Sequence, residues 1–274
     1  MESSLLLIAL GLVVGVFGTL IGAGGGFVLM PVLLFLYPRA NPETITSISL
    51  AVVFFNALSG SYAYARMRRI DYKSGLLFAT ATVPGAIIGA LTTSYIPRRL
   101  FDAGFGLLMI VAAAYLSFRQ TEDGKTAEEG NKRHIARNIV EPNGTVHLFS
   151  YDLRLGMWLS LLVGYVSSLL GIGGGIVHVP VLVRLLNFPV HIATATSHFI
   201  LAIMALTGTI AHIATGSFSH GGIRRTVCLA IGVLLGAQVG AWLSARVHGT
   251  WIIRGLAVAL AFVGIRILIM ALQP

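Results

Sequence analysis

Two clusters of glycine residues are the part of this sequence whose spacing points most directly to chemistry. Each cluster places four glycines within five residues, and a proline follows five residues after the last glycine. The clusters are Gly22, Gly24, Gly25 and Gly26 with Pro31, and Gly171, Gly173, Gly174 and Gly175 with Pro180. Because each glycine costs a helix roughly 1 kcal/mol relative to alanine, we expect one helix to end at each cluster and another to begin after it. The unpaired N–H groups and positive dipole end of the new helix suit an anion.

Glycines at a spacing of four residues have a second interpretation, which is close packing of membrane helices. This spacing occurs at Gly18, Gly22 and Gly26, at Gly85 and Gly89, and at Gly232, Gly236 and Gly240. For the last two sets we favour packing. For the four-glycine clusters, which occur twice and with their prolines, we favour a functional site.

Polar side chains inside the apolar stretches are further candidates for contact with a substrate. They are the hydroxyls of Thr46, Ser47, Thr196 and Ser197, the amide of Asn56, and the imidazoles of His178 and His198. The hydroxyls either line a pathway or bond to their own backbone, and amides such as Asn56 and Gln238 either contact a ligand or join helices. Histidine in a membrane span is a proton relay, an anion contact or a neutral core residue. For His212 and Arg266 a functional and a structural role both stay open.

Acidic residues are absent from the middle of every apolar stretch. All ten lie at the ends of expected helices or in one polar segment: Glu2, Glu43, Asp71, Asp102, Glu122, Asp123, Glu128, Glu129, Glu141 and Asp152. A cation bound at mid-membrane normally requires a carboxylate, so an interior with histidines and helix N-termini favours an anion. The sequence also lacks a His-Glu-x-x-His cluster and a Gly-x-Ser-x-Gly element. We therefore predict no enzyme, no catalytic residues, no metal and no cofactor.

The composition indicates that the lipid bilayer is the solvent of this chain. Hydrophobic residues make up 56% and charged residues 11%, against roughly 45–50% and about 25% in soluble proteins. Apolar stretches such as 76–96 and 251–272 reach the roughly 20 residues that one helical span requires. Since lipid offers the backbone no hydrogen bonds, we predict an all-α, multi-pass protein of the cell (inner) membrane. The net charge of +9 falls in short clusters at the ends of these stretches, which is typical of membrane topology signals rather than nucleic-acid binding.

The sequence contains two copies of one module. Residues 20–33 match residues 169–182 at an offset of 149. Thr46–Ser47 then pairs with Thr196–Ser197, Ser59–Gly60 with Thr207–Gly208, and residues 85–89 with 236–240. Because the order is kept with slips of a residue or two, this pattern indicates a duplication.

The duplication divides the chain into three parts. We predict a first transmembrane repeat at 1–118, a polar cytoplasmic linker at 119–154 and a second transmembrane repeat at 155–274, with about 8–10 transmembrane segments broken at the glycine clusters. The basic residues are compatible with parallel and with inverted repeats. We favour inverted repeats with both termini outside, because such repeats around a central site recur in transporters.

The repeated Gly-x-Gly-Gly-Gly-x-x-x-x-Pro element, the Thr-Ser pair, the Asn-Ala-Leu-Ser-Gly stretch at 56–60 and the two-copy layout resemble the TauE/SafE family of sulfite and sulfonate exporters. The resemblance implies a permease that moves sulfur oxyanions or small organosulfonates across the cytoplasmic membrane, coupled to an ion gradient such as protons. By motif it carries over the glycines and prolines of both clusters together with Thr46, Ser47, Asn56, Thr196 and Ser197. The second copy departs from the first, since it has no asparagine opposite Asn56 and carries histidines that the first copy lacks.

Two other functions stay open at this point. An anion channel would show flux that does not saturate, and a membrane scaffold or assembly factor would need no polar interior. The partners expected for the transporter are a small anion, the lipid bilayer and coupling protons, with no nucleic acid. The sequence does not determine the oligomeric state.

Overall fold

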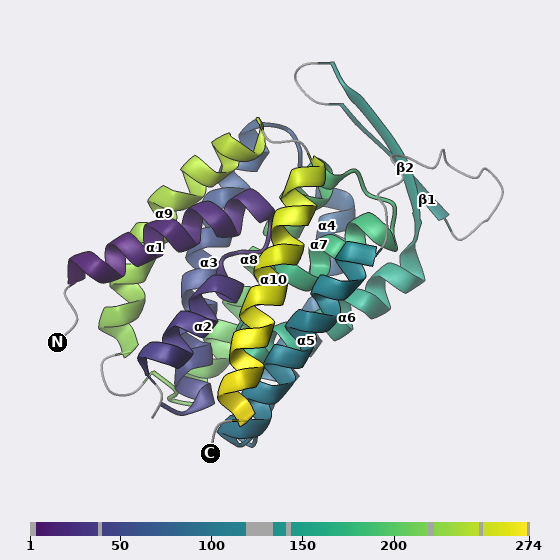
Figure 1. Cartoon of the computed structure of the whole chain (residues 1–274). Helices are drawn as coiled ribbons and strands as arrows, with labels where there is room; N and C mark the ends of the chain where they lie inside the picture. The colour runs from purple at the N-terminus through teal and green to yellow at the C-terminus, as the bar shows by residue number, and fades with distance from the viewer. Residues whose placement is uncertain are drawn as a thin grey trace.

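The described residues form ten α-helices and one β-hairpin (Figure 1). The computed structural model describes residues 4–37, 40–118, 134–140, 144–218, 222–246 and 249–272. The helices of the first half are α1 (Ser4–Ile21), α2 (Gly26–Leu36), α3 (Pro42–Arg66), α4 (Tyr72–Thr93) and α5 (Arg98–Phe118). Those of the second half are α6 (Leu153–Leu170), α7 (Gly175–Arg184), α8 (Val190–Ala214), α9 (Gly222–Ser244) and α10 (Gly249–Leu272). The hairpin consists of β1 (His134–Val140) and β2 (Val146–Asp152).

The predicted helix breaks occur at both glycine clusters. α1 ends at Ile21 and α2 begins at Gly26, while α6 ends at Leu170 and α7 begins at Gly175. α2 has 11 residues and α7 has 10. At about 1.5 Å per residue, neither short helix spans a hydrocarbon core about 30 Å thick. The first turn of each short helix therefore lies inside the bundle, directly after the break.

Six of the described helices are long and apolar enough to cross a membrane, namely α1, α3, α4, α6, α8 and α9. Large apolar side chains are widely exposed on them, for example Leu5 and Phe17 on α1 and Trp158 on α6. Such a surface requires lipid around it. The predicted class, a helical integral membrane protein, is confirmed at this level.

The two halves interlock rather than forming separate bundles. α1 packs along α9 and α6 packs along α4, so each half supplies one helix to each pair; α3 pairs with α8 and α5 with α10. α3 and α8 pack against each other and run antiparallel, as the hydrogen bonds at their two ends show. Glu43, in the first turn of α3, accepts a hydrogen bond from Ser217, just beyond the end of α8 (2.5 Å). At the other end the backbone N–H of Asp71, beyond α3, donates to Thr196 in the second turn of α8 (3.0 Å).

Glycines spaced four residues apart make these pairs close. A Cβ atom at Gly85 would lie 2.8 Å from the backbone nitrogen of Tyr165 on α6. One at Gly236 would lie 2.9 Å from the backbone nitrogen of Val16 on α1. Both distances are too short for a side chain, so the packing interpretation of these two glycine sets is confirmed.

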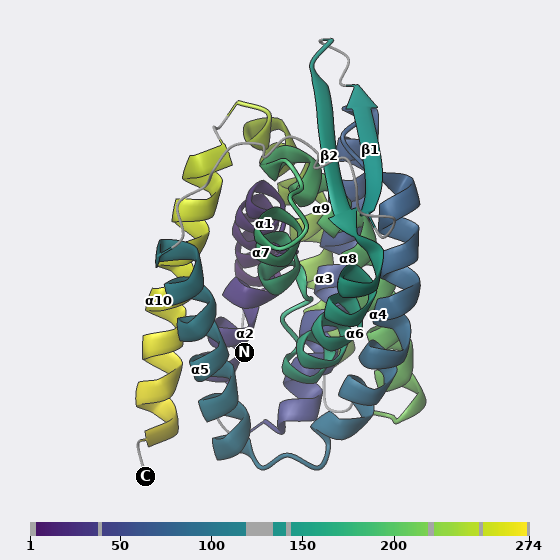
Figure 2. The same ribbon diagram turned by 90° about the vertical axis from the view of Figure 1, so that its right-hand side faces the viewer.

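The segment predicted as a polar linker contains a β-hairpin that we did not predict. Its strands pair antiparallel, from His134 opposite Asp152 to Val140 opposite Val146. The hairpin projects from the end of the bundle where α3 ends and α8 begins, which we call the hairpin face (Figure 2). Asp152 accepts hydrogen bonds from the N–H groups of Arg154 (2.8 Å) and Leu155 (3.2 Å), so β2 leads directly into α6. Residues 119–133 and 141–143 of the predicted linker lie outside the described residues.

Candidate functional site

The two glycine breaks pack directly on one another at the centre of the protein. A Cβ atom at Gly26 would lie 2.6 Å from the carbonyl carbon of Ile172 in the second break, and one at Gly175 would lie 2.6 Å from the Cα of Ala23 in the first. Three glycines in each break have a positive φ: Gly22, Gly24 and Gly25 at 81°, 74° and 80°, and Gly171, Gly173 and Gly174 at 66°, 79° and 79°. Other residues rarely adopt this backbone conformation. The structure therefore brings together both predicted clusters and explains why they are glycine.

Each break faces the long central helix of the other half. A Cβ at Gly22 would touch Thr194 of α8 (2.9 Å to its Cα), and one at Gly171 would touch Thr46 of α3 (3.0 Å). The hydroxyl of Ser197 donates to the carbonyl of Gly22 (3.3 Å). The hydroxyl of Ser49, which we had not predicted, donates to the carbonyl of Gly171 (2.6 Å).

These contacts correct the pairing of the two copies along α3 and α8. Thr46 corresponds to Thr194 and Ser49 to Ser197, because each pair makes the same contact with opposite breaks. The offset in these helices is 148, as it is for the match of Gly60 with Gly208. The predicted pairing of Thr46–Ser47 with Thr196–Ser197 is therefore wrong by two residues. A shift of two residues rotates a helical side chain by about 200°, so matching dipeptides had concealed which hydroxyls face a break.

The other two predicted hydroxyls face elsewhere. Ser47 donates to the carbonyl of Thr44 in its own helix (2.8 Å). Thr196 accepts a hydrogen bond from the N–H of Asp71 (3.0 Å). Thr46 faces the second break, where its buried hydroxyl has no partner among the described residues.

A fully buried polar cluster lies beside the first break. The hydroxyl of Thr19 donates to the amide oxygen of Asn56 (3.1 Å) and lies 3.3 Å from Nε2 of His198. The phenol of Tyr64 donates to the carbonyl of Thr19 (2.7 Å), and its ring contacts His198 edge to face. All four side chains are at most 1% exposed. We call these residues, Thr19, Asn56, Tyr64 and His198, the first-break cluster.

Two polar atoms of the first-break cluster are available to a ligand. The amide nitrogen of Asn56 has no partner among the described residues. Nδ1 of His198 has none within the usual hydrogen-bond limits, but the backbone of Gly22 lies close enough to interact with this ring. A buried donor without a partner normally costs about 1–3 kcal/mol. A buried polar atom without a partner therefore calls for an explanation, and a bound ligand would be one.

Apolar side chains replace Asn56 and His198 beside the second break, where the hydroxyls of Thr46, Ser167 and Ser168 are buried without partners among the described residues. A Cβ at Gly60 would lie 2.9 Å from Nε2 of His198, whereas one at Gly208 would lie 3.0 Å from Cδ1 of Leu50. Leu50 thus stands where His198 stands in the other half. Met204 takes the place of Asn56 and packs against Gly174, with its sulfur 3.1 Å from a Cβ at that position.

Backbone N–H groups at the breaks are also unpaired. Within the described chain no backbone carbonyl accepts from the N–H groups of Gly25, Gly26 and Phe27, or of Gly173, Gly174 and Ile176. These groups lie at the starts of α2 and α7, where the helix dipoles are positive. The predicted electrostatic preference for an anion therefore has a structural basis at both breaks.

The remaining buried histidines belong to other surroundings. Nε2 of His178 lies 3.1 Å from the hydroxyl of Ser160, and its ring packs near Phe78. Nδ1 of His212 lies 3.4 Å from the hydroxyl of Ser217. Arg266 is exposed on α10. The first-break cluster therefore contains His198 but none of these three residues.

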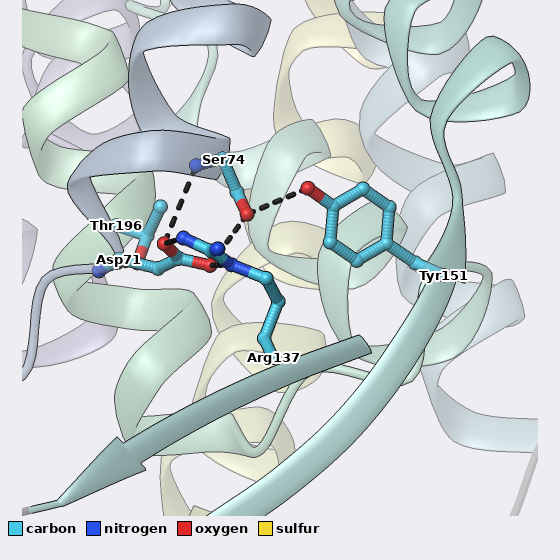
Figure 3. A network of polar contacts seen from close by, with 5 residues as sticks. All are labelled: Asp71, Ser74, Arg137, Tyr151 and Thr196. Atoms are coloured by element: carbon cyan, nitrogen blue, oxygen red, sulfur yellow. Dashed lines mark hydrogen bonds and ion pairs between the residues drawn. The ribbon is translucent and has the colours of Figure 1, made fainter. Parts of the chain in front are cut away.

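A second polar cluster, which sequence reasoning missed, joins the hairpin to the helices (Figure 3). The buried carboxylate of Asp71 accepts from Arg137 of β1, with 2.9 Å between Arg137 Nε and Asp71 Oδ2 and a second, closer contact to Oδ1. It also accepts from the hydroxyl of Ser74 (2.5 Å), which in turn accepts from the phenol of Tyr151 (2.6 Å). An acidic residue at a helix end gave no sign of this role, because its partner lies 66 residues away.

The charge of Asp71 is held by its partners. Burial raises the pKa of this carboxyl, but the hydrogen bonds from Arg137 and Ser74 outweigh burial, so the pKa lies below the ordinary value of 3.8. A carboxyl whose pKa is lowered by folding stabilises the folded state above pH 3.8. This contribution to stability is lost as the pH falls through the lowered pKa. We therefore expect the ion pair to persist throughout the neutral and mildly acidic range.

An apolar crevice of about 530 Å³ opens between α3, α8 and α9. It is lined by Ala51, Phe54, Phe55, Leu206, Thr209, Ile210, Ile213, Gly216, Phe218, Ile223, Thr226 and Val227. None of the predicted site residues lines it. In the described part of the chain, no group of three His, Cys, Asp or Glu side chains is placed to hold a metal ion.

Membrane-length helices around two central helix breaks define a multi-pass membrane protein. A model of the sulfite exporter TauE/SafE family matches residues 7–267, and the chain belongs to this family. It is 32% identical to the probable membrane transporter protein YunE of Bacillus subtilis over 97% of both chains. It is 27% identical to the probable membrane transporter protein MJ0441 of Methanocaldococcus jannaschii, over 76% of this chain and 72% of the relative. No solved structure matches the chain. Family and relatives together identify a membrane transporter.

Proposed function

We propose that this transporter moves a small anion, sulfite or another sulfur oxyanion or organosulfonate, across the cytoplasmic membrane. The description of its family names sulfite export. The electrostatics of the interior agree with such a substrate, because the breaks offer unpaired N–H groups and dipole ends. A tetrahedral or pyramidal oxyanion accepts several hydrogen bonds at once, as this arrangement requires.

The observation that carries the proposal is the difference between the polar groups beside the two breaks. Asn56 and His198 place an amide and an imidazole at the first break, while Met204 and Leu50 occupy the corresponding positions at the second, whose free polar groups are hydroxyls. We therefore place the substrate at the first break, held by the first-break cluster and the N–H groups before α2.

Inverted repeats and alternating access are the proposed mechanism. The antiparallel course of α3 and α8, which are corresponding helices of the two halves, supports inversion. Rocking of one half against the other around the packed breaks would expose the first break to each side in turn. The excess of basic residues in and near the linker supports a cytoplasmic hairpin face.

Proton coupling is the proposed source of energy. His198 is the histidine of the first-break cluster, and imidazole is the side chain whose ordinary pKa is nearest to physiological pH. Its contact with Thr19 joins it to Asn56, so a proton and an anion would bind within the same cluster.

The experiment that tests the proposal is flux into proteoliposomes containing the purified protein. Radiolabelled sulfite, thiosulfate, sulfate and a small sulfonate are supplied with and without an imposed pH gradient. We expect saturable flux of at least one of them, increased by the gradient. Flux that does not saturate would indicate an anion channel instead, and no flux above empty liposomes for any of the four would contradict the proposal.

A further inference from the structure

The two ends of the central helix pair differ in how tightly they are closed. At the end away from the hairpin, Ala51 of α3 and Thr226 of α9 line the apolar crevice of about 530 Å³. The corresponding residues at the hairpin face are Phe199 of α8, at the offset of 148, and Gly75 of α4, at the offset of 151 found for residues 85–89 and 236–240. There the space is filled, because a Cβ at Gly75 would lie 2.9 Å from the ring of Phe199.

Phe199 is itself held in place by the start of α4. Its ring contacts that of Tyr72 edge to face, with 5.4 Å between the centroids. The next residue toward the N-terminus is Asp71, whose carboxylate pairs with Arg137 of the hairpin. The hairpin thus fixes the segment that packs against Phe199.

Among the described residues, the opposite end has no ion pair at the position equivalent to Asp71. The residue that corresponds to Asp71 is Gly222, and a Cβ there would meet nothing closer than 3.7 Å. Thr226, which corresponds to Gly75, has a buried hydroxyl without a partner among the described residues. Closure at the hairpin face is therefore supplied by the hairpin and not by the duplicated module.

The Asp71 network also reaches the first break. The N–H of Asp71 donates to Thr196, and the next residue of α8, Ser197, donates to the carbonyl of Gly22. Figure 3 shows Thr196 and Arg137 on either side of Asp71. A movement of the Asp71 segment would therefore be transmitted along one turn of α8 to the proposed substrate site.

We propose that the hairpin is a gate, in which the ion pair of Arg137 with Asp71 holds the hairpin face closed and must separate before the first break opens to that side. Tyr151 and Ser74 reinforce the closed state, since their hydroxyls bond to each other beside the ion pair. The gate has a role only if the proposed transport function holds. Closure of the hairpin face, however, is measurable in the protein without substrate.

The experiment measures thiol accessibility at the two corresponding positions. The native Cys228 is first replaced (Cys228→Ala), and Phe199→Cys and Ala51→Cys are then made separately. Each protein is reconstituted in lipid nanodiscs, and the rate of reaction with N-ethylmaleimide is followed by mass spectrometry. With Arg137 intact, we expect Phe199→Cys to react slowly, because the backbone of Gly75 and the ring of Tyr72 pack against this position.

Loss of the ion pair should change the reaction rates at the two positions in opposite directions. Adding Arg137→Gln should raise the rate at Phe199→Cys by at least about fivefold and lower the rate at Ala51→Cys, as expected for a shift between two states. The matched control is Lys73→Gln, which removes a positive charge from an exposed position two residues from Asp71. If Arg137→Gln alone fails to fold, the double variant Asp71→Asn with Arg137→Gln removes both charges and leaves neither buried unpaired.

Equal rates in the Arg137→Gln and Lys73→Gln proteins at both positions would overturn the gate. A rise at Phe199→Cys without any fall at Ala51→Cys would also overturn it, because it would indicate local loosening of the hairpin rather than exchange between the two faces. Since labelling requires no substrate, failure of the gate is distinguishable from failure of the transport proposal.

Discussion

The first and second glycine breaks share one backbone and differ in what surrounds it. Both have three glycines with positive φ, both precede a short helix, and both receive a serine hydroxyl from the central helix of the other half. Beside the first break lies the polar cluster of Thr19, Asn56, Tyr64 and His198, while Leu50 and Met204 stand in the places of His198 and Asn56 beside the second.

This difference separates what duplication preserves from what function selects. The backbone of a break depends on glycine alone and is retained in both halves. The side chains beside it depend on one or two substitutions, and these place an amide and an imidazole beside the first break and two apolar side chains, those of Met204 and Leu50, at the same positions beside the second. The substitutions of Gly25 and Gly174, of Asn56 and Met204, and of Ser49 and Ser197 change corresponding positions in the two halves.

The largest effect is expected from bulky side chains in the breaks themselves. Gly25→Leu and Gly174→Leu should each abolish flux in proteoliposomes while membrane insertion continues, because a positive φ costs other residues about 1–3 kcal/mol and a Cβ would lie 2.7 Å from Val14 or 3.1 Å from Met204. Gly104→Leu is the control, since no atom lies within 4 Å of a Cβ there. Normal flux in both variants would show that transport does not depend on the glycine breaks.

The smaller substitution to alanine should distinguish the two breaks. At Gly25 a Cβ would lie 2.9 Å from the backbone oxygen of Val14, whereas at Gly174 it faces the flexible end of Met204. Gly174→Ala should therefore retain more flux than Gly25→Ala. The reverse order would show that the second break is the more tightly constrained.

The amide of Asn56 should matter more than the thioether that replaces it in the other half. Asn56→Leu should lower the ratio of maximal flux to KM about 10-fold to 100-fold, the equivalent of one lost hydrogen bond to a charged group. Met204→Leu conserves volume and should change that ratio little. Comparable losses in the two variants would mean that the substrate contacts both halves equally.

Replacing His198 by leucine would make the two halves alike at the position of His198 and Leu50. His198→Leu places the residue found at Leu50 beside the first break, and we expect flux to fall about threefold to tenfold and to lose its response to an imposed pH gradient. His178→Leu, which removes a histidine bonded to Ser160, should keep that response. A gradient response that survives in His198→Leu would assign proton coupling to another group.

The smallest effect concerns the two serines that bond to the breaks. Ser49→Ala removes a hydrogen bond of 2.6 Å to Gly171, and Ser197→Ala removes one of 3.3 Å to Gly22. We expect Ser49→Ala to reduce the free energy of unfolding by about 1 kcal/mol and Ser197→Ala by less, since hydrogen bonds weaken with length. Thermal unfolding in detergent would measure the difference, and a larger loss in Ser197→Ala would contradict it.

Much of the architecture was predictable because membrane proteins obey strict local rules. Long apolar stretches predicted the helices, the glycine clusters predicted the breaks, and glycines such as Gly85 and Gly236 predicted close packing. The β-hairpin was missed, since two seven-residue strands within a polar segment carry a weak signal. The site was found in part: Asn56 and His198 were predicted, but Thr19, Tyr64 and Ser49 resemble the many hydroxyl residues of apolar helices.

The sequence by itself determined that this is a helical membrane protein, built from two copies whose helices break at glycine. These properties follow from backbone conformation and hydrophobicity, which act within a few residues of the chain. Only the tertiary structure decided that Ser49 and not Ser47 contacts a break, that Leu50 corresponds to His198, and that Asp71 pairs with Arg137. Such contacts depend on helix rotation and on residues far apart in the chain, and a shift of two positions is enough to turn a side chain away.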